Sequence, residues 1–251
     1  MFLARPERTP YDLSWRMFGI PIRVHPFFWV FTAIIGWHHV RDGLQFLIIW
    51  IASVFISILL HELGHIWMGR LFGSRGEIVL YSFGGLAIGS KQLRKRWQRI
   101  AVSAAGPGIQ LLLWGALVGI VYLTPLPKNV YVVELYDMLI WINLYWAIFN
   151  LIPIWPLDGG QISREIWEGI SKRRGTKIAL QLSIALALII ALNAGYAVMP
   201  NGKRVIPFLP VGIYIAILFG MLMLTNVQAL QAENERNRWR EDRAYYDEND
   251  W

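Results

Sequence analysis

Long apolar segments alternate with short polar loops along most of this chain of 251 residues. An apolar run of about 20 residues is long enough to cross the hydrocarbon core of a bilayer as a helix. The pattern therefore predicts an α-helical polytopic membrane protein with about six transmembrane helices. The apolar segments are residues 26–40, 44–72, 100–124, 131–154, 177–198 and 208–230.

Two stretches outside these segments have the pattern of β-strands. Residues 76–90 are rich in β-branched and aromatic side chains and contain Gly84-Gly85 in the middle, which predicts a β-hairpin. Residues 19–24 are a second, shorter strand candidate that could pair with it. The alternative for the longer stretch is an irregular loop at the membrane interface. We expect a small membrane-associated β-hairpin or sheet.

Composition narrows the class of protein further. Apolar residues make up 55% of the chain, and its mean hydropathy of +0.40 is too high for an ordinary soluble domain. The first 15 residues contain no apolar core that ends in small residues, so we expect no cleavable signal peptide. The chain has no Cys, so any metal must be held by His and carboxylate side chains.

The formal net charge of +7 arises mainly from basic residues in the loops. If both termini are cytoplasmic, 20 of the 24 Lys and Arg residues lie on the inner side of the membrane. This excess follows the positive-inside rule, so we expect a multi-pass protein of the plasma (inner) membrane with cytoplasmic N- and C-termini. Membrane orientation accounts for the basic residues, and we expect no nucleic-acid partner. The residues left on the outer side are Arg41, Lys128, Lys203 and Arg204.

The second apolar segment carries the motif His61-Glu62-Leu63-Gly64-His65 near its end. Residues i and i+4 share one face of a helix, so both imidazoles can reach one metal ion with Glu62 beside them. A catalytic zinc takes three protein ligands and activates a water molecule, whose proton a neighbouring carboxylate can accept. The alternative is a solvated face of an amphipathic helix. Ionisable groups inside a membrane are costly without a partner, which favours zinc with Glu62 as general base.

Two His leave a zinc ion one protein ligand short, and the end of the fourth segment offers a third. Residues 150–160 read Asn-Leu-Ile-Pro-Ile-Trp-Pro-Leu-Asp-Gly-Gly, and their Pro and Gly residues break the helix near Asp158. Irregular backbone at membrane depth is tolerated only where it is buried in protein or lines a wet cavity. The alternative for Asp158 is a simple turn residue. The ligand count favours one Zn2+ ion per chain, held by His61, His65 and Asp158.

The two motifs together resemble the site-2 protease family of intramembrane zinc metalloproteases, in a minimal form without PDZ or CBS modules. The resemblance implies zinc ligation by His61, His65 and Asp158. It also implies general-base catalysis by Glu62, and a role for Asn150 in orienting substrate or stabilising the oxyanion. Further matches lie at residues 19–26, 82–85 and 105–107.

The resemblance further implies membrane-anchored protein substrates, cleaved in or near their transmembrane segments within the lipid bilayer. Residues 1–230 would form the protease domain and 231–251 a charged cytoplasmic tail. We expect the strand around residues 78–81 to offer an exposed edge beside the active site and to align the substrate there as a neighbouring strand. The alternatives are a metal-handling transporter, which has no need of Glu62, and a membrane-partner binder that does not cleave, which the intact His-Glu-His-Asp set disfavours. Oligomeric state does not follow from these motifs.

Overall fold

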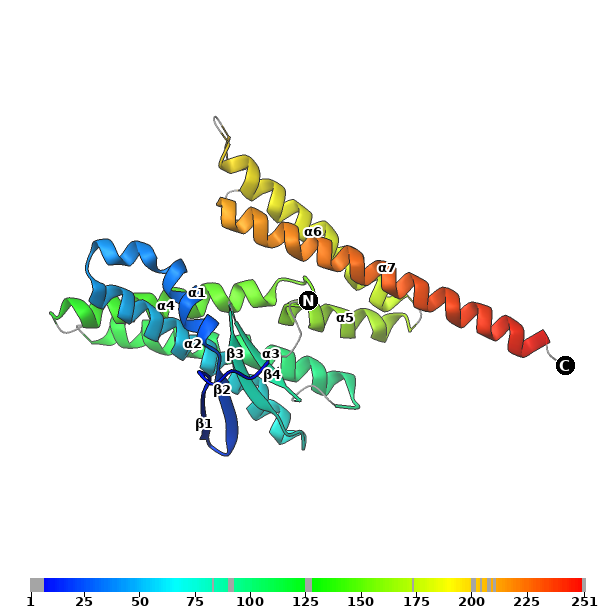
Figure 1. Cartoon of the computed structure of the whole chain (residues 1–251), viewed down its shortest axis with the longest axis horizontal. Coiled ribbons are helices and arrows are strands. Elements are labelled where there is room, and N and C mark those ends of the chain that lie inside the picture. Colours follow the sequence, from blue (N-terminus) through cyan, green and yellow to red (C-terminus); the bar gives the residue numbers. More distant parts are fainter. Residues whose placement is uncertain are drawn as a thin grey trace. The chain divides into compact units, whose positions relative to one another are not determined.

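A computed structural model of the chain describes residues 7–249 apart from 83, 90–92, 125–127, 173, 200, 201, 204, 207, 208 and 210. The chain divides into two compact units, Met1–Asn150 and Leu151–Trp251. Figure 1 shows the elements in chain order. The first unit holds β1 (Leu13–Met17), β2 (Ile20–Val24), α1 (Pro26–Ile35), the 3-10 helix η1 (Trp37–Arg41), α2 (Leu44–Leu71), β3 (Glu77–Tyr81), β4 (Gly84–Ile88), α3 (Arg96–Leu123) and α4 (Val130–Leu151). The second unit holds α5 (Asp158–Ile170), α6 (Gly175–Ala197) and α7 (Ile213–Asn249).

In the described part of the chain, five helices are long and apolar enough to cross a membrane, namely α2, α3, α4, α6 and α7. A sheet of four strands accompanies them. The predicted fold class, a polytopic helical membrane protein with a small sheet, is therefore confirmed.

The first predicted span differs from the others because its helix is short. α1 has 10 residues, or roughly 15 Å of helix, which is half the thickness of a hydrocarbon core. It ends at Gly36, where an added Cβ would collide with the Trp50 ring of α2. The Trp50 indole Nε1 donates a hydrogen bond to the Thr32 carbonyl at 3.0 Å. These contacts hold α1 against α2. The chain continues as η1 before α1 is long enough to cross a bilayer.

The sheet has the strand order β1-β2-β3-β4. β3 and β4 form the predicted antiparallel hairpin, and β2 pairs with β3 in parallel, with Val24 opposite Leu80. Both strand predictions are confirmed, except that residues 83 and 90 of the predicted hairpin lie outside the described residues. Because β3 has a partner on each side, the expectation that residues 78–81 offer a free edge is wrong. The edge of the sheet on this side is β4.

β1 was not predicted from the sequence. It pairs with β2 through a tight turn at Phe18 and Gly19, which both have positive φ, of 51° and 71°. Two-residue hairpin turns of this kind favour Asn-Gly or Asp-Gly. Phe at a positive φ is an uncommon choice, so the usual signal for such a turn was absent.

One face of the sheet packs against the half of α2 that carries the His-Glu-x-x-His motif. Alternate residues of β2 and β3 point to this face, as the two-residue period of a strand requires. They join buried residues of α1 and α2 in one apolar cluster, so the sheet is fixed to the metal-motif end of α2. The cluster contains Ile20, Ile22, Val24, Phe28, Ile58, Leu59, Leu63, Ile66, Ile78 and Leu80.

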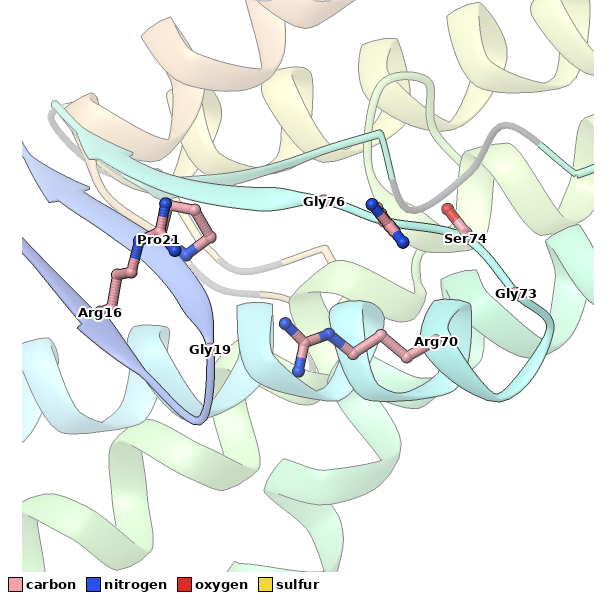
Figure 2. Close-up of a pocket in the computed structure, with 8 residues that line it drawn as sticks. Arg16, Gly19, Pro21, Arg70, Gly73, Ser74 and Gly76 are labelled. Carbon is pink, nitrogen blue, oxygen red and sulfur yellow. The ribbon is translucent and has the colours of Figure 1, made fainter.

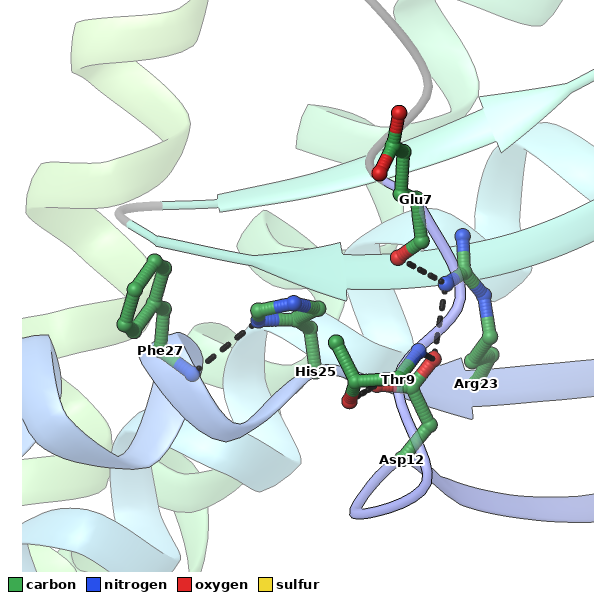
Figure 3. A network of polar contacts seen from close by, with 6 residues as sticks. All are labelled: Glu7, Thr9, Asp12, Arg23, His25 and Phe27. Carbon is green, nitrogen blue, oxygen red and sulfur yellow. Dashed lines mark hydrogen bonds and ion pairs between the residues drawn. The ribbon is translucent and has the colours of Figure 1, made fainter.

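The opposite face of β2 carries a polar network (Figure 3). Arg23 donates to the Asp12 carboxylate at 2.8 Å and to the Glu7 carbonyl at 3.2 Å, while the Thr9 hydroxyl donates to Asp12 at 2.6 Å. Burial raises the pKa of Asp12, but the hydrogen bonds from Thr9 and Arg23 outweigh it and lower the pKa from 3.8 to about 2. The network ties the segment before β1 to the sheet.

In the second unit, α6 and α7 lie side by side, and α5 packs against α6 (Figure 1). α7 continues as one helix past residue 230, so the segment predicted as a charged tail begins as an extension of an apolar helix. This continuity follows from composition, since residues 231–243 are rich in Glu and Arg, which are good helix formers.

Candidate metal centre

The two imidazoles of the motif on α2 lie together and are buried. His61 and His65 are 3% and 2% exposed, and their Nε2 atoms lie 3.1 Å apart. The unbroken helix produces this approach, since residues four apart are stacked on one face. Two nitrogens bound to one zinc ion at about 2.0–2.1 Å lie roughly 3.3 Å apart in tetrahedral geometry. The observed spacing therefore fits a shared metal ion.

Hydrogen bonds to the other ring nitrogens fix the tautomers of both His residues. His65 Nδ1 lies 2.7 Å from the Val102 carbonyl, which can only accept, so this nitrogen carries the proton. His61 Nδ1 lies 2.9 Å from Gln110 Oε1, and Gln110 is held in this orientation by donating to the Ser57 carbonyl at 3.3 Å. The two Nε2 atoms, which face each other, are then the ring nitrogens that can bind a metal. Metal-binding His residues are commonly oriented in this way, through a hydrogen bond at the other ring nitrogen.

Gly106 on α3 leaves the space that such an ion needs. A Cβ at this position would collide with His65 Nε2 and lie 2.9 Å from His61 Nε2. Gly64 on α2 serves the same packing, because its Cβ would lie 2.6 Å from the Ala105 carbonyl oxygen. Gly64 and Gly106 together allow α2 and α3 to approach closely at the imidazole pair. The donor set and the free space together fit a transition metal ion.

Glu62 lies directly beneath the edge strand of the sheet. Its side chain is 5% exposed, and a Cβ on Gly85 of β4 would lie 2.6 Å from the Glu62 Oε1 atom. The backbone of β4 therefore passes over the carboxylate with no side chain between them. This contact explains one glycine of the Gly84-Gly85 pair, which sequence analysis treated only as a turn signal.

In the second unit, Asp158 is the first residue of α5 and is 5% exposed. The two glycines that follow it allow α5 to pack against the irregular backbone before it. A Cβ on Gly159 would lie 2.6 Å from the Ile152 carbonyl oxygen, and one on Gly160 would collide with the backbone between Ile154 and Trp155. The Asp-Gly-Gly sequence is thus required by close packing and not only by a turn.

Side chains from α6 and α7 satisfy the backbone of this irregular segment. The Trp155 N–H donates to Ser183 Oγ at 3.1 Å, and Asn226 Nδ2 donates to the Trp155 carbonyl at 2.7 Å. Ser183 and Asn226 are 1% and 0% exposed. Irregular backbone at membrane depth needs such partners. Ser183 and Asn226 were not singled out from the sequence, although each is a polar residue within an apolar span.

Asn150 lies in the last turn of α4, where it is half-buried. Its Nδ2 donates to the Trp146 carbonyl of the same helix at 2.9 Å. The first unit therefore brings together His61, His65 and Glu62, and places Asn150 at its end. Asp158 belongs to the second unit, where it is buried at the start of α5.

Known proteins are similar to this chain in sequence. The family model of peptidase family M50 matches residues 49–128 and 115–190. A zinc metalloprotease of Methanocaldococcus jannaschii is 34% identical over 182 residues, which cover 70% of this chain and 52% of that protein. Stage IV sporulation protein FB of Bacillus subtilis is 28% identical over 185 residues, covering 72% and 59%. The chain thus spans little more than half the length of the curated relatives it matches.

A solved structure extends the comparison to the fold. The site-2 protease from Methanocaldococcus jannaschii matches with a TM-score of 0.62 and 26% identity, over 88% of this chain and 95% of that one. The family match includes α2 with its His-Glu-x-x-His motif and α5 with Asp158. The chain belongs to peptidase family M50, the site-2 protease family.

Proposed function

We propose that the chain is an intramembrane zinc metalloprotease that hydrolyses peptide bonds in or near the transmembrane segments of membrane-anchored proteins. The observation that carries the proposal is the imidazole pair of α2, with its two Nε2 atoms 3.1 Å apart beside Glu62. The zinc metalloprotease and site-2 protease relatives support the same activity.

His61, His65 and Asp158 would hold one zinc ion. Two neutral imidazoles and a carboxylate are a ligand set that catalytic zinc commonly uses, with one position left for water. Zinc bound there would supply a Lewis acid that makes water a nucleophile near neutral pH. All three side chains are buried, as a site that excludes bulk water requires.

Glu62 would be the general base. It adjoins His61 in the sequence, and its carboxylate lies beneath β4, where a peptide lying along the sheet would pass. Glu62 would accept the proton of the attacking water and return it to the leaving amine nitrogen. Asn150 would orient the substrate or stabilise the oxyanion, exchanging its bond to the Trp146 carbonyl for one to the peptide.

The edge of β4 would align the substrate. A peptide bond in a helix is shielded, so the transmembrane helix of a substrate must unwind locally, and its freed backbone groups then need partners. An edge strand offers a row of them. Because β4 crosses Glu62, a substrate strand added to β4 would bring its carbonyl carbon near the base.

Orientation and domain limits complete the proposal. The distribution of basic residues supports cytoplasmic N- and C-termini in the plasma (inner) membrane. The protease domain would be residues 1–230, and 231–251 would be a charged extension. In this orientation the motif end of α2 lies towards the cytoplasmic side.

Replacement of the base tests the mechanism directly. Glu62→Gln should keep zinc and lose at least about 100-fold in cleavage of a single-span reporter, because it removes the proton acceptor and no ligand. His61→Ala, His65→Ala and Asp158→Ala should instead lower bound zinc, measured by elemental analysis of the purified chains. Substantial cleavage by zinc-loaded Glu62→Gln would refute the mechanism.

A photo-crosslinking residue tests substrate alignment in the Glu62→Gln background. Placed at Leu86 of β4 it should capture the reporter, whereas the same residue at Val79, directly opposite on the interior strand β3, should not. Equal capture at both positions would show that the substrate is held elsewhere.

A further inference from the structure

A basic cavity lies in the first unit, away from the imidazole pair. The tip of the β1–β2 hairpin, the end of α2 and the loop before β3 line an open cavity of about 600 Å³ (Figure 2). Three arginines line it, namely Arg16 from β1, Arg70 from α2 and Arg75 from the loop. The other lining residues are small or neutral, including Gly19, Gly73 and Ser74.

The charge of this cavity is not compensated within the described part of the chain. No described acidic residue lines it, and no described carboxylate pairs with any of the three arginines. Arg70 donates to the Phe18 carbonyl at 2.7 Å, which holds the guanidinium in place but leaves its charge unbalanced. Three guanidinium groups around one cavity repel each other, and an anion between them would relieve that repulsion.

The loop that carries Arg75 is held in position before any ligand binds. The Gly73 N–H donates to the Arg70 carbonyl at 2.9 Å, and the Ser74 N–H donates to the Gly69 carbonyl at 2.9 Å. The Ser74 hydroxyl donates to the Gly89 carbonyl at 2.7 Å. A pre-ordered loop loses little backbone entropy on binding, which favours the binding of a ligand beside Arg75.

Large apolar side chains lie next to lining residues of this cavity in the sequence, although they do not line it themselves. Phe18 is 70% exposed at the hairpin tip, and its ring lies 6.1 Å from that of Trp67 on α2. Leu71, the last residue of α2, is 78% exposed. α2 is a membrane-spanning helix, and aromatic residues at such helix ends mark the membrane interface. The end of α2, which carries Arg70, would therefore lie at the depth of lipid headgroups, with Arg16 and Arg75 lining the same cavity.

We propose that this cavity binds the phosphate group of an anionic phospholipid. Guanidinium groups match phosphate oxygens in paired hydrogen bonds, and three of them suit a group that presents several oxygens. Phe18, Trp67 and Leu71 identify a lipid as the source of the phosphate, because they would contact its glycerol and acyl region. A free phosphate would use the arginines alone and leave these side chains exposed.

Lipid binding to the purified full-length chain in detergent tests the proposal. Native mass spectrometry would count dioleoylphosphatidylglycerol and dioleoylphosphatidylcholine bound per chain. We expect one phosphatidylglycerol held about tenfold or more tighter than phosphatidylcholine, and the triple variant Arg16→Gln/Arg70→Gln/Arg75→Gln to lose that preference. The matched control removes the same charge from exposed residues elsewhere, through Arg94→Gln/Lys95→Gln/Lys172→Gln, and should stay within about twofold of wild type.

Zinc content and thermal unfolding of the same variants would show that each is folded. Equal binding of the two lipids by wild type, or equal loss in both triple variants, would overturn the proposal. A triple variant with Arg70→Lys in place of Arg70→Gln should keep part of the preference for phosphatidylglycerol. Lys retains the positive charge but not the forked pair of donors of the guanidinium group.

A second experiment distinguishes the binding of a lipid from the binding of free phosphate. Phe18→Ser/Leu71→Ser should weaken phosphatidylglycerol binding while leaving the arginines unchanged, and millimolar inorganic phosphate should displace the lipid poorly. If inorganic phosphate displaces it fully and the Ser variant binds phosphatidylglycerol like wild type, the cavity is a free-phosphate site and the lipid assignment is wrong.

Discussion

The imidazole pair in the first unit and Asp158 in the second are positioned by different physical means. His61 and His65 stand on an unbroken helix, and neighbouring groups set only their tautomers. Asp158 begins a helix that follows irregular backbone, and distant side chains from α6 and α7 hold that backbone. Because the helix is regular, the position of the two imidazoles depends only on residues that are close together in the sequence. The position of Asp158 depends on contacts between segments up to 71 residues apart.

The largest effect should come from filling the space beside the imidazoles. Gly106→Ala places a methyl group against both Nε2 atoms. We expect zinc affinity to fall by about 100-fold or more, since changes outside the ligand shell alone cost about 10–100-fold. Gly108→Ala is the matched control, because the same change on the same helix meets no atom within 4 Å. Zinc titration of both purified variants measures the difference.

Alanine is the better helix former, so lost helix stability would not account for a defect in Gly106→Ala. Normal zinc affinity in a folded Gly106→Ala chain would mean that the ion does not lie between His61 and His65.

Removing the hydrogen-bond partner of His61 should have the next largest effect. Gln110→Met keeps the length of the side chain but loses the oxygen that fixes the tautomer of His61. We expect zinc affinity to fall by about 10–100-fold, with cleavage restored at saturating zinc because no ligand is lost. Gln110→Glu keeps an acceptor for Nδ1 and should retain more affinity than Met. Identical zinc titration curves for Met and Glu would contradict a role in tautomer selection.

The corresponding test in the second unit is Asn226→Leu, which leaves the buried Trp155 carbonyl without its hydrogen bond. An unsatisfied buried carbonyl costs about 1–3 kcal/mol, and a segment loosened by that amount should lower zinc affinity by roughly tenfold. Thr225→Val is the control, since Thr225 is only half-buried and its hydroxyl donates to the Met221 carbonyl of its own helix. Thermal unfolding and zinc titration would be measured together. Reduced stability with unchanged zinc affinity would show that Asn226 supports the fold and not Asp158.

The same contrast explains what the sequence could predict. The five-residue motif on α2 needed only the helical period, so His61, Glu62 and His65 could be assigned from spacing. Asp158 could be proposed from ligand count, but Ser183 and Asn226 could not be linked to it, because no pattern in the sequence pairs α6 and α7 with the irregular segment. β1 was missed for a local reason, the unusual Phe18-Gly19 turn. The free edge was assigned to β3 because the sequence does not show which strand of the hairpin pairs with β2.

The smallest effect concerns the polar face of the sheet, which stabilises the first unit without contributing to the metal site. The pKa of Asp12 is raised by burial but lowered more by Thr9 and Arg23, to about 2 from 3.8. A lowered pKa in the folded state stabilises the fold above about pH 4, and this stabilisation is lost as the pH falls from 4 towards 2. Asp12→Asn removes the titrating group, so the difference in unfolding free energy between wild type and variant should be on the order of 1–2 kcal/mol at pH 6 and shrink below pH 4. Thermal unfolding in detergent across this range measures it. A difference that stays constant from pH 6 to pH 2 would mean that the Arg23–Asp12 pair does not stabilise the sheet through its charge.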